Sequence, residues 1–228
     1  MENTIIVTLR CKDMRSFGRQ ALTGMWSGAV LATLLMMALS LVPLLSFKLV
    51  FDSVTMEKVS DLYTMIVSGP ITLGYIYFIL SVFRRKSTSP IEVFYGFERF
   101  FKALGLTLVM SFFIILWTLL FIVPGIIASI RYSMAFYILA DHPEMGILDI
   151  INESKRLMKG NKLKFFCLQF SFIGWIFLVC LTAGIGSLWL IPYMEASTAG
   201  FYELANGNLR PQYPELAANE ENRGSPIL

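Results

Sequence analysis

The stretch LGLTLVMSFFIILWTLLFIVPGIIASIRYSMAFYILA, residues 104–140, is apolar throughout except for one charged residue, Arg131. As one straight helix it would be about 55 Å long at about 1.5 Å per residue, well beyond a hydrocarbon core of about 30 Å. The chain must therefore turn back within it. Pro124–Gly125 is the expected place, because proline removes a backbone donor and glycine permits the reversal. The stretch predicts two successive membrane spans.

Composition extends this prediction to the whole chain. Of the 228 residues, 56% are hydrophobic and only 15% are charged, and the mean hydropathy is +0.64. Such a chain is too apolar for an ordinary soluble domain. The net charge of +3 arises from clusters beside apolar segments. We therefore expect the lipid bilayer, not nucleic acid, to be its partner.

Six apolar runs are candidate spans, each close to the length of about 20 residues that a crossing needs. They lie near residues 25–47, 66–83, 104–123, 125–140, 163–181 and 186–204. We expect an all-α, polytopic transmembrane helix bundle, with about six spans as three hairpins, forming a single domain over residues 1–205. Residues 206–228 are polar and contain three prolines, so we expect a disordered cytoplasmic tail.

The basic residues predict the orientation. Sixteen of the nineteen lie on one side of the expected spans: Arg10, Lys12, Arg15, Arg19, Arg84, Arg85, Lys86, Arg99, Lys102, Lys155, Arg156, Lys159, Lys162, Lys164, Arg210 and Arg223. By the positive-inside rule, both termini are cytoplasmic. The first apolar run is too long for the core of a cleavable signal and has no small-residue cleavage site behind it.

Two segments on the basic side are predicted to be amphipathic interfacial helices, near residues 90–103 and 144–160. Ser89, Pro90 and Glu92 have the capping-box pattern of a helix start. Six basic residues of these segments are candidates for binding anionic lipid headgroups: Arg99, Lys102, Lys155, Arg156, Lys159 and Lys162. The alternative is that they only fix the topology.

The hairpins show a weak internal repeat. Each begins with a basic, amphipathic segment, and each is expected to turn at small or helix-breaking residues, which are Gly69–Pro70, Pro124–Gly125 and Gly184–Gly186. Three hairpins in parallel orientation would follow from this repeat. Repetition is found in transporters, and it is equally a way to enlarge a helix bundle.

Arg131 is the candidate functional residue, because a guanidinium at membrane depth is costly unless it is paired or hydrated. Counted from the outer turns, Arg131 and Glu195 differ in depth by roughly 4–5 Å at 1.5 Å per residue, so we expect them to pair. Tyr132 and Tyr193 would complete an intramembrane polar centre, with Tyr137, Gln169, Ser197 and Thr198 as further hydrogen-bonding groups. The pair would serve either function or helix register.

Catalytic and metal motifs are sparse. The single histidine, His142, precedes Pro143 in a predicted loop, so a histidine-based zinc site or a serine nucleophile with a histidine base has no support. Cys11, Cys167 and Cys180 have no paired spacing and cannot form a disulfide framework. We therefore expect no enzymatic activity, no metal site and no cofactor.

Several motifs also resemble a bacterial family of six-span membrane proteins of unknown function. They are Arg19–Gly24, Arg131–Asp141, Pro143–Gly146, Met158–Lys162, Ser171–Trp175, Gly184–Gly186, Leu188–Leu190 and Pro192–Tyr193. The resemblance implies a bacterial cytoplasmic (inner) membrane and supports the topology, but it brings no activity with it. A remoter resemblance, to the membrane region attached to some glycerophosphodiester phosphodiesterases, implies a connection with lipids.

The function expected from these observations is that of a transporter-like or lipid-interacting membrane module with a buried Arg/Glu polar centre. The alternative is a non-transporting interaction protein, such as an accessory subunit or an immunity factor against a membrane-active peptide. The sequence specifies neither a substrate nor a protein partner or homo-oligomer.

Overall fold

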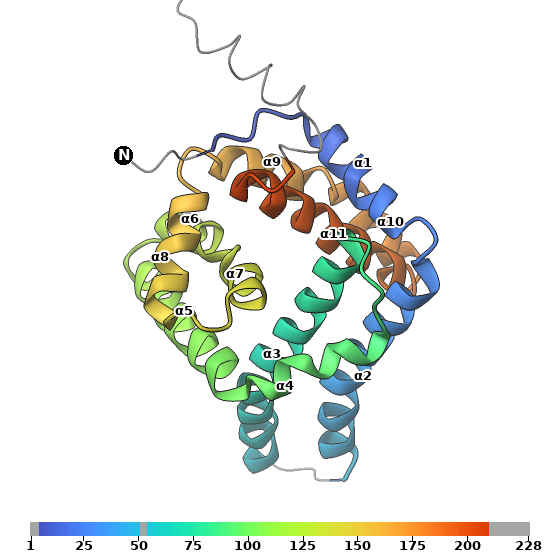
Figure 1. The fold of residues 1–228 in the computed structure, drawn as a ribbon. Coiled ribbons are helices and arrows are strands. Elements are labelled where there is room, and N and C mark those ends of the chain that lie inside the picture. Colours follow the sequence, from blue (N-terminus) through green and yellow to red (C-terminus); the bar gives the residue numbers. More distant parts are fainter. Residues whose placement is uncertain (1–4, 51–53, 210–228) are drawn as a thin grey trace, which may run out of the picture.

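The computed structural model describes residues 5–50 and 54–209, with all of their side chains except those at 42–44, 46–50 and 54–57. Within this part of the chain there are eleven α-helices, one 3-10 helix and no strand, which confirms the all-α prediction (Figure 1). The segment at 210–228, which is most of the predicted tail, lies outside the described residues.

The first two helices meet at a sharp bend. α1 (Cys11–Leu22) is amphipathic and buries Met14, Gly18, Ala21 and Leu22. α2 (Trp26–Val50) is apolar, and the angle between α1 and the Trp26–Leu41 part of α2 is 96°. Gly24, between them, has φ +84°, a left-handed conformation that glycine adopts without strain. α1 therefore runs across the direction of α2 and does not extend it.

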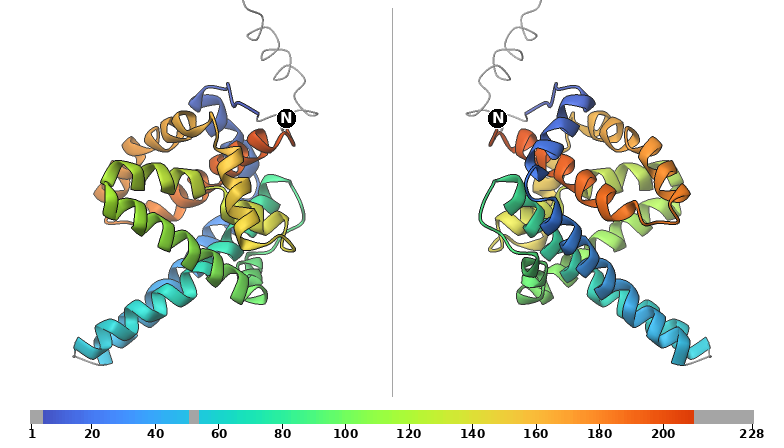
Figure 2. Two further views of the ribbon diagram at one scale, coloured as in Figure 1. Left: turned by 90° about the vertical axis from the view of Figure 1, so that its left-hand side faces the viewer. Right: turned by 90° about the vertical axis from the view of Figure 1, so that its right-hand side faces the viewer.

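α3 (Val54–Phe83) is longer than the expected run at 66–83. The hairpin of α2 and α3 projects beyond the other helices in Figure 2. Pro70 lies inside α3, so the turn predicted at Gly69–Pro70 is wrong. Gly69 serves a different purpose, because a Cβ there would lie 2.8 Å from the Ala103 carbonyl oxygen of α5. The absence of a side chain lets the two helices approach closely.

The predicted interfacial helix at 90–103 is divided. A 3-10 helix (η1, Pro90–Phe94) leads into the single turn of α4 (Tyr95–Glu98), and α5 (Phe100–Leu120) then begins. The expected capping box is wrong, since the Ser89 side chain makes no cap hydrogen bond. The Glu92 carboxylate instead accepts a hydrogen bond from Thr88 Oγ1 at 2.5 Å.

The chain does turn back within residues 104–140, but at Phe121 and not at Pro124–Gly125. Phe121 is extended, with φ −159° and ψ 148°, and α6 (Ile122–Tyr132) begins immediately after it. Pro124 fits in the first turn of α6, where its missing N–H leaves no hydrogen bond unmade. Gly125 faces α5, where a Cβ would lie 3.0 Å from Thr118 Cα.

Two of the predicted spans, at 125–140 and 163–181, each consist of two helices separated by a break. α6 is followed by α7 (Ala135–Asp141), and α9 (Lys162–Phe170) is followed by α10 (Ile173–Leu181). Between them α8 (Ile147–Leu157) lies within the range predicted for the second interfacial helix. The chain turns at Gly184–Gly186, as predicted. Ala183 and Gly184 have positive φ there, and α11 (Ser187–Asn206) follows.

α11 is the central helix of the fold. It contacts α1, α2, α3 and α10, and every residue from Ala196 to Ala205 is buried. Small residues allow this packing, because a Cβ on Gly18 of α1 would lie 2.7 Å from the Ser197 backbone nitrogen. α11 therefore resembles a core helix more than a lipid-facing one.

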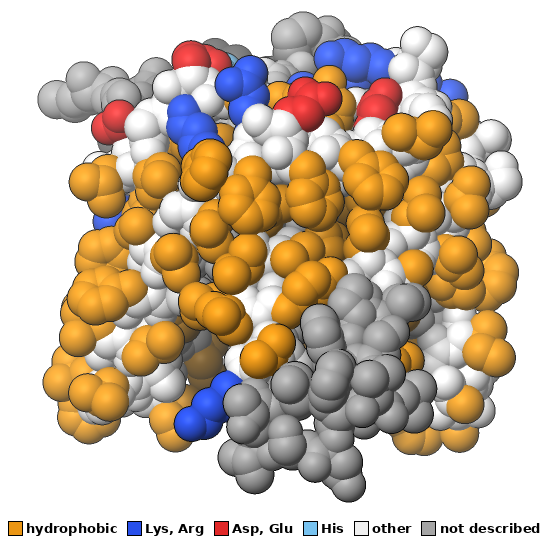
Figure 3. Space-filling model, turned by 90° about the horizontal axis from the view of Figure 1, so that it is seen from below, with side chains coloured by type: hydrophobic (Ala, Val, Ile, Leu, Met, Phe, Trp, Pro, Cys, Tyr) orange, Lys and Arg blue, Asp and Glu red, His pale blue; other side chains and the backbone are white. Residues whose placement is uncertain are grey.

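Four helical stretches are long and apolar enough to cross a membrane: Lys58–Phe83, Phe100–Leu120, Ile122–Asp141 and Lys162–Leu181. The bent pair of α1 and α2 would add a fifth, within the part of the chain that the structure describes. Figure 3 shows charged side chains gathered along one edge of a face that is otherwise mostly hydrophobic. These features indicate a membrane protein.

Candidate functional site

Arg131 and Glu195 do not form the predicted pair. Arg131 lies in the last turn of α6 with an exposed side chain, and among the described residues no carboxylate forms an ion pair with it. Its backbone carbonyl accepts a hydrogen bond from Ser154 Oγ of α8 at 2.8 Å. The break after Tyr132 separates α6 from α7. Arg131 lies on the surface of the helix bundle, beside α8, and therefore needs no buried counter-ion.

Glu195 instead accepts a hydrogen bond from Tyr137 of α7. The Tyr137 hydroxyl lies 2.6 Å from Glu195 Oε2 and 3.3 Å from the Glu195 backbone carbonyl oxygen. Tyr137 is 2% exposed, whereas Glu195 is half-buried. One turn further along α11, Thr198 Oγ1 accepts a hydrogen bond from Gln169 Nε2 at 3.2 Å. A polar centre therefore exists around Glu195, with a phenol in place of the expected guanidinium.

A second hydrogen-bonded pair belongs to the same interior. The hydroxyls of Thr33 in α2 and Tyr75 in α3 are 2.8 Å apart and buried. Tyr75 is near enough to Glu195 for an electrostatic interaction. This pair was not predicted, because a tyrosine and a threonine in apolar runs are ordinary components of membrane helices.

The two predicted tyrosines lie elsewhere. Tyr132 is buried against Phe113, and the Lys155 ammonium lies over its ring, 5.8 Å from the centroid. Tyr193 packs edge-on against Phe172 and Trp175, with ring centroids 5.3 and 6.3 Å away. Neither is hydrogen-bonded to Glu195 in the described part of the chain.

The six predicted headgroup residues are in different situations. Lys102 Nζ donates a hydrogen bond to the Pro143 carbonyl at 2.5 Å, and Lys155 Nζ donates one to Asn152 Oδ1 at 3.2 Å. Arg156 forms an ion pair with Glu153. Arg99 and Lys159 are exposed, and Lys162 is half-buried. Half of the set is thus already engaged within the protein.

The strongest ionic cluster is one that the sequence analysis missed. Arg84, just after α3, donates Nη1 to Asp141 Oδ1 at 2.5 Å and Nη2 to Asp141 Oδ2 at 2.6 Å. Its Nε donates to Glu203 Oε1 at 2.6 Å. The Glu203 side chain is only 4% exposed. The ends of α3, α7 and α11 are joined at this cluster.

Hydrogen bonds from neighbouring side chains complete the cluster. The Tyr202 hydroxyl donates to Asp141 Oδ2 at 2.9 Å, and Asn208 Nδ2 donates to Glu203 Oε2 at 2.7 Å. Burial disfavours the charged guanidinium, but the hydrogen bonds and charges of the two carboxylates outweigh it and raise the pKa of Arg84. Arg84 is therefore a permanent cation shared by two anions. The sequence did contain one clue to this cluster. Arg84, Asp141 and Glu203 each lie at the end of an apolar run, and these three ends were predicted to be on the same side of the membrane.

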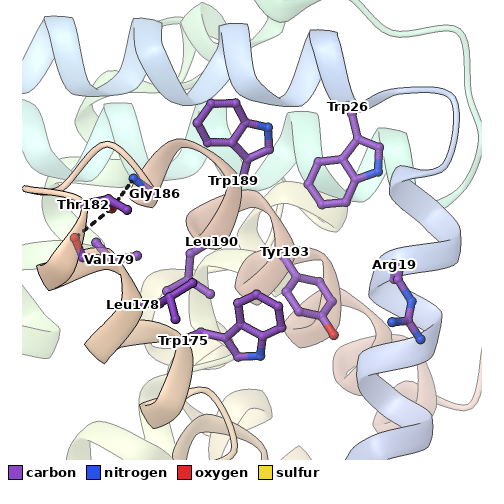
Figure 4. Close-up of a pocket in the computed structure, with 10 residues that line it drawn as sticks. All are labelled: Arg19, Trp26, Trp175, Leu178, Val179, Thr182, Gly186, Trp189, Leu190 and Tyr193. Carbon is purple, nitrogen blue, oxygen red and sulfur yellow. Dashed lines mark hydrogen bonds between the residues drawn. The ribbon is translucent and has the colours of Figure 1, made fainter.

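An aromatic pocket lies between α1, α2, α10 and α11 (Figure 4). Its volume is about 310 Å³, and its walls are almost entirely apolar. Three of the four tryptophans line it, and the lining residues are Arg19, Trp26, Trp175, Leu178, Val179, Thr182, Gly186, Trp189, Leu190 and Tyr193. We call it the tryptophan pocket. Nothing in the sequence indicated this pocket, because its tryptophans are at widely separated positions in the chain.

The two ends of the tryptophan pocket differ. Arg19 and the Tyr193 hydroxyl lie at one end, and Thr182 and Gly186 lie at the other (Figure 4). Arg19 is exposed, and no described carboxylate forms an ion pair with it. A second apolar hollow of about 500 Å³ shares Trp26 and Trp189 with the pocket and continues along α2 to Leu34. The result is an apolar groove that ends at Arg19, a cation with no ion-pair partner among the described residues.

No group of histidine, cysteine or carboxylate side chains suited to a metal ion occurs within the described residues. His142 lies 3.4 Å from Glu144 in an exposed loop. Cys11 and Cys167, which lack any paired spacing in sequence, have their sulfur atoms 2.6 Å apart.

A sequence profile of one protein family matches residues 9–130 and 119–208. The chain belongs to the DUF975 family. This family is described as a protein of unknown function, in agreement with the resemblance noted from the motifs. No curated protein and no solved structure matches the chain, so the function of this DUF975 protein has to be inferred from the tryptophan pocket and the polar centre.

Proposed function

We propose that this DUF975 protein is a multi-pass membrane protein that binds an anionic lipid of the bilayer in the tryptophan pocket. The lipid headgroup would lie at Arg19, and an acyl chain would follow the apolar groove past Trp26 and Trp189. The observation that carries the proposal is the combination of an apolar pocket of about 310 Å³ with a single unpaired guanidinium at its end.

Physical chemistry favours an amphiphile over a polar solute. Apolar walls offer a polar ligand few hydrogen bonds in exchange for those it loses from water. Indole rings are apolar but carry one polar group, and such side chains concentrate at the level of lipid headgroups. Arginine is the side chain best suited to a phosphate, because its planar guanidinium donates several hydrogen bonds.

The proposed topology places Arg19 at a suitable depth. Both termini are assigned to the cytoplasmic side of a bacterial inner membrane, from the distribution of basic residues and the motif resemblance. α1 would then lie along the inner surface, since it is amphipathic and bent by 96° away from α2. A lipid of the inner leaflet would present its headgroup to Arg19 and its chains to the groove. The assigned role is binding, not catalysis.

Tryptophan fluorescence offers a direct experiment. Trp117 is outside the pocket and 41% exposed on α5, so Trp117→Phe leaves only the three tryptophans that line the pocket. In nanodiscs, we expect spin-labelled phosphatidylglycerol to quench this fluorescence more strongly than spin-labelled phosphatidylcholine at the same low mole fraction. A basic residue near the membrane surface contributes about 1 kcal/mol to binding an anionic lipid, or roughly fivefold in relative affinity.

Arg19→Gln in the same background removes the cation and keeps the pocket, so the preference for the anionic lipid should disappear. Arg99→Gln is the matched control, because Arg99 is also an exposed arginine but lies outside the pocket. Equal quenching by the two lipids in the parent protein would contradict the proposal. An equal loss of preference in both arginine variants would assign it to general surface charge.

A further inference from the structure

Among the described residues, Glu195 has no positively charged partner in an ion pair. It lies near the middle of α11, between the outer turn at Gly186 and the inner end of the helix. Of the described Lys, Arg and His side chains, none forms an ion pair with it. Its carboxyl group has a neutral donor instead, the Tyr137 hydroxyl at 2.6 Å.

Among the described residues, the surrounding helices bring tyrosines near Glu195, and none of their cations forms an ion pair with it. α7 presents Tyr137, and α3 presents Tyr75, which is bonded to Thr33. On α1, Arg15 donates to the Ser171 carbonyl, and Arg19 lines the tryptophan pocket. The described side chains of α2 and all side chains of α10 are uncharged.

An ionised carboxylate is unfavourable in this position. Removing a charge from water is expensive, and one neutral hydrogen bond offsets only a small part of that free energy. A bound proton removes the charge while the hydrogen bond to Tyr137 can remain.

We propose that Glu195 is a proton-binding site in the centre of the bundle, holding one proton at neutral pH, with Tyr137 as the residue that positions its carboxyl group. Acidic residues held inside membrane bundles are typical of proton relays and ion pathways. The site rests on Glu195 and Tyr137, whereas the lipid site rests on Arg19 and the tryptophans, so either proposal can fail without the other.

Infrared spectroscopy of the protein in nanodiscs at about pH 7 tests this state. A protonated carboxyl group has a C=O stretching band separate from the carboxylate bands. We expect the parent spectrum to contain one such band that Glu195→Gln removes, while Glu98→Gln, at an exposed carboxylate, leaves it in place. Tyr137→Phe keeps Glu195 but removes its hydrogen-bond donor, so the band should remain and shift.

The pH dependence of thermal stability gives a second readout that does not depend on the Gln variant. If the folded protein holds a proton that the unfolded chain has released, the Tm of the parent should fall as the pH is raised above neutral. The fall should end at the pH at which the folded protein also releases the proton, and Tyr137→Phe should move that end point. A C=O band that is absent at about pH 7 and at lower pH would overturn the proposal, as would a carboxylate band that Glu195→Gln removes at neutral pH.

Discussion

The guanidinium of Arg84 holds the carboxylate of Asp141 through two parallel hydrogen bonds, 2.5 and 2.6 Å long. Arg84 follows α3 and Asp141 ends α7, and the same guanidinium also binds Glu203 of α11. Bidentate arginine–carboxylate pairs combine charge with a fixed geometry. This cluster therefore sets how three helices meet at the end of the bundle that we assign to the cytoplasm.

Replacing Arg84 should destabilise the protein strongly. Arg84→Gln would leave Asp141 and Glu203, with 13% and 4% of their side chains exposed, without their cation. Breaking a fully buried ion pair costs about 3–5 kcal/mol. Since the Arg84 side chain is itself 27% exposed, we expect roughly 2–3 kcal/mol, measured as a loss of unfolding free energy in detergent.

Lys86→Gln is the matched control, because Lys86 is an exposed cation two residues away and forms none of the cluster's ion pairs among the described residues. Its stability should change by less than about 0.5 kcal/mol, as for most surface substitutions. Arg84→Lys should not restore the parent stability, since an ammonium cannot make the bidentate contact. Equal stability of Arg84→Gln and the parent would show that the cluster does not hold these helices together.

The close contact of α1 with α11 depends on Gly18. A Cβ at Gly18 would lie 2.7 Å from the backbone nitrogen of Ser197 and 2.9 Å from its Cα. Because backbone atoms cannot move aside, Gly18→Ala should cost about 1–3 kcal/mol, as overpacking does. Gly28→Ala, where a Cβ meets nothing within 4 Å, should be neutral or stabilising. Thermal unfolding of both variants checks the difference, and a neutral Gly18→Ala would mean that α1 and α11 are further apart.

Two cysteines report the packing of α1 on α9. The sulfur atoms of Cys11 and Cys167 are 2.6 Å apart, so a mild oxidant such as copper phenanthroline should join them within one chain. Peptide mapping after proteolysis would detect the disulfide. Cys180→Ser should leave the yield unchanged, whereas Cys167→Ser should abolish it. If Cys11 reacted no faster with Cys167 than with Cys180, the placement of α1 would be wrong.

Cysteine labelling in cells tests the topology. In a background without native cysteines, Lys58→Cys and Ile185→Cys, both exposed positions on the predicted outer side, should react with a membrane-impermeant maleimide. Ser87→Cys, on the predicted inner side, should react only after the membrane is permeabilised. Labelling of Ser87→Cys in intact cells would reverse the assigned orientation, and protection of Ile185→Cys would place the turn before α11 on the inner side.

Apolar runs were enough to predict helices, since each run contains a helix and the described chain contains no strand. The chain reversal was predictable from length alone. Its location was not, because Pro124 is as acceptable in the first turn of a helix as in a loop. The breaks after Tyr132 and Phe170 were also hidden, because hydrophobicity continues through them without a change in pattern.

The pairing of side chains was the least predictable part. Depth along a helix can be counted, and this placed Arg131 and Glu195 at similar levels. The direction in which a side chain points depends on rotation about the helix axis, which an almost uniformly apolar sequence does not reveal. The break between α6 and α7 then leaves Tyr137, and not Arg131, beside Glu195. The tryptophan pocket could not be predicted for the same reason, because its residues come from four helices.

The most direct measurement for the lipid-binding proposal is photo-crosslinking with a phosphatidylglycerol that carries a photoreactive group on its acyl chain, followed by peptide mapping. We predict that labelling concentrates on the pocket segments around Trp26, Trp175 and Trp189, and that Arg19→Gln reduces it several-fold. Labelling spread over the exposed apolar face of α5, including Leu116 and Leu119, and unaffected by Arg19→Gln, would contradict lipid binding in the tryptophan pocket.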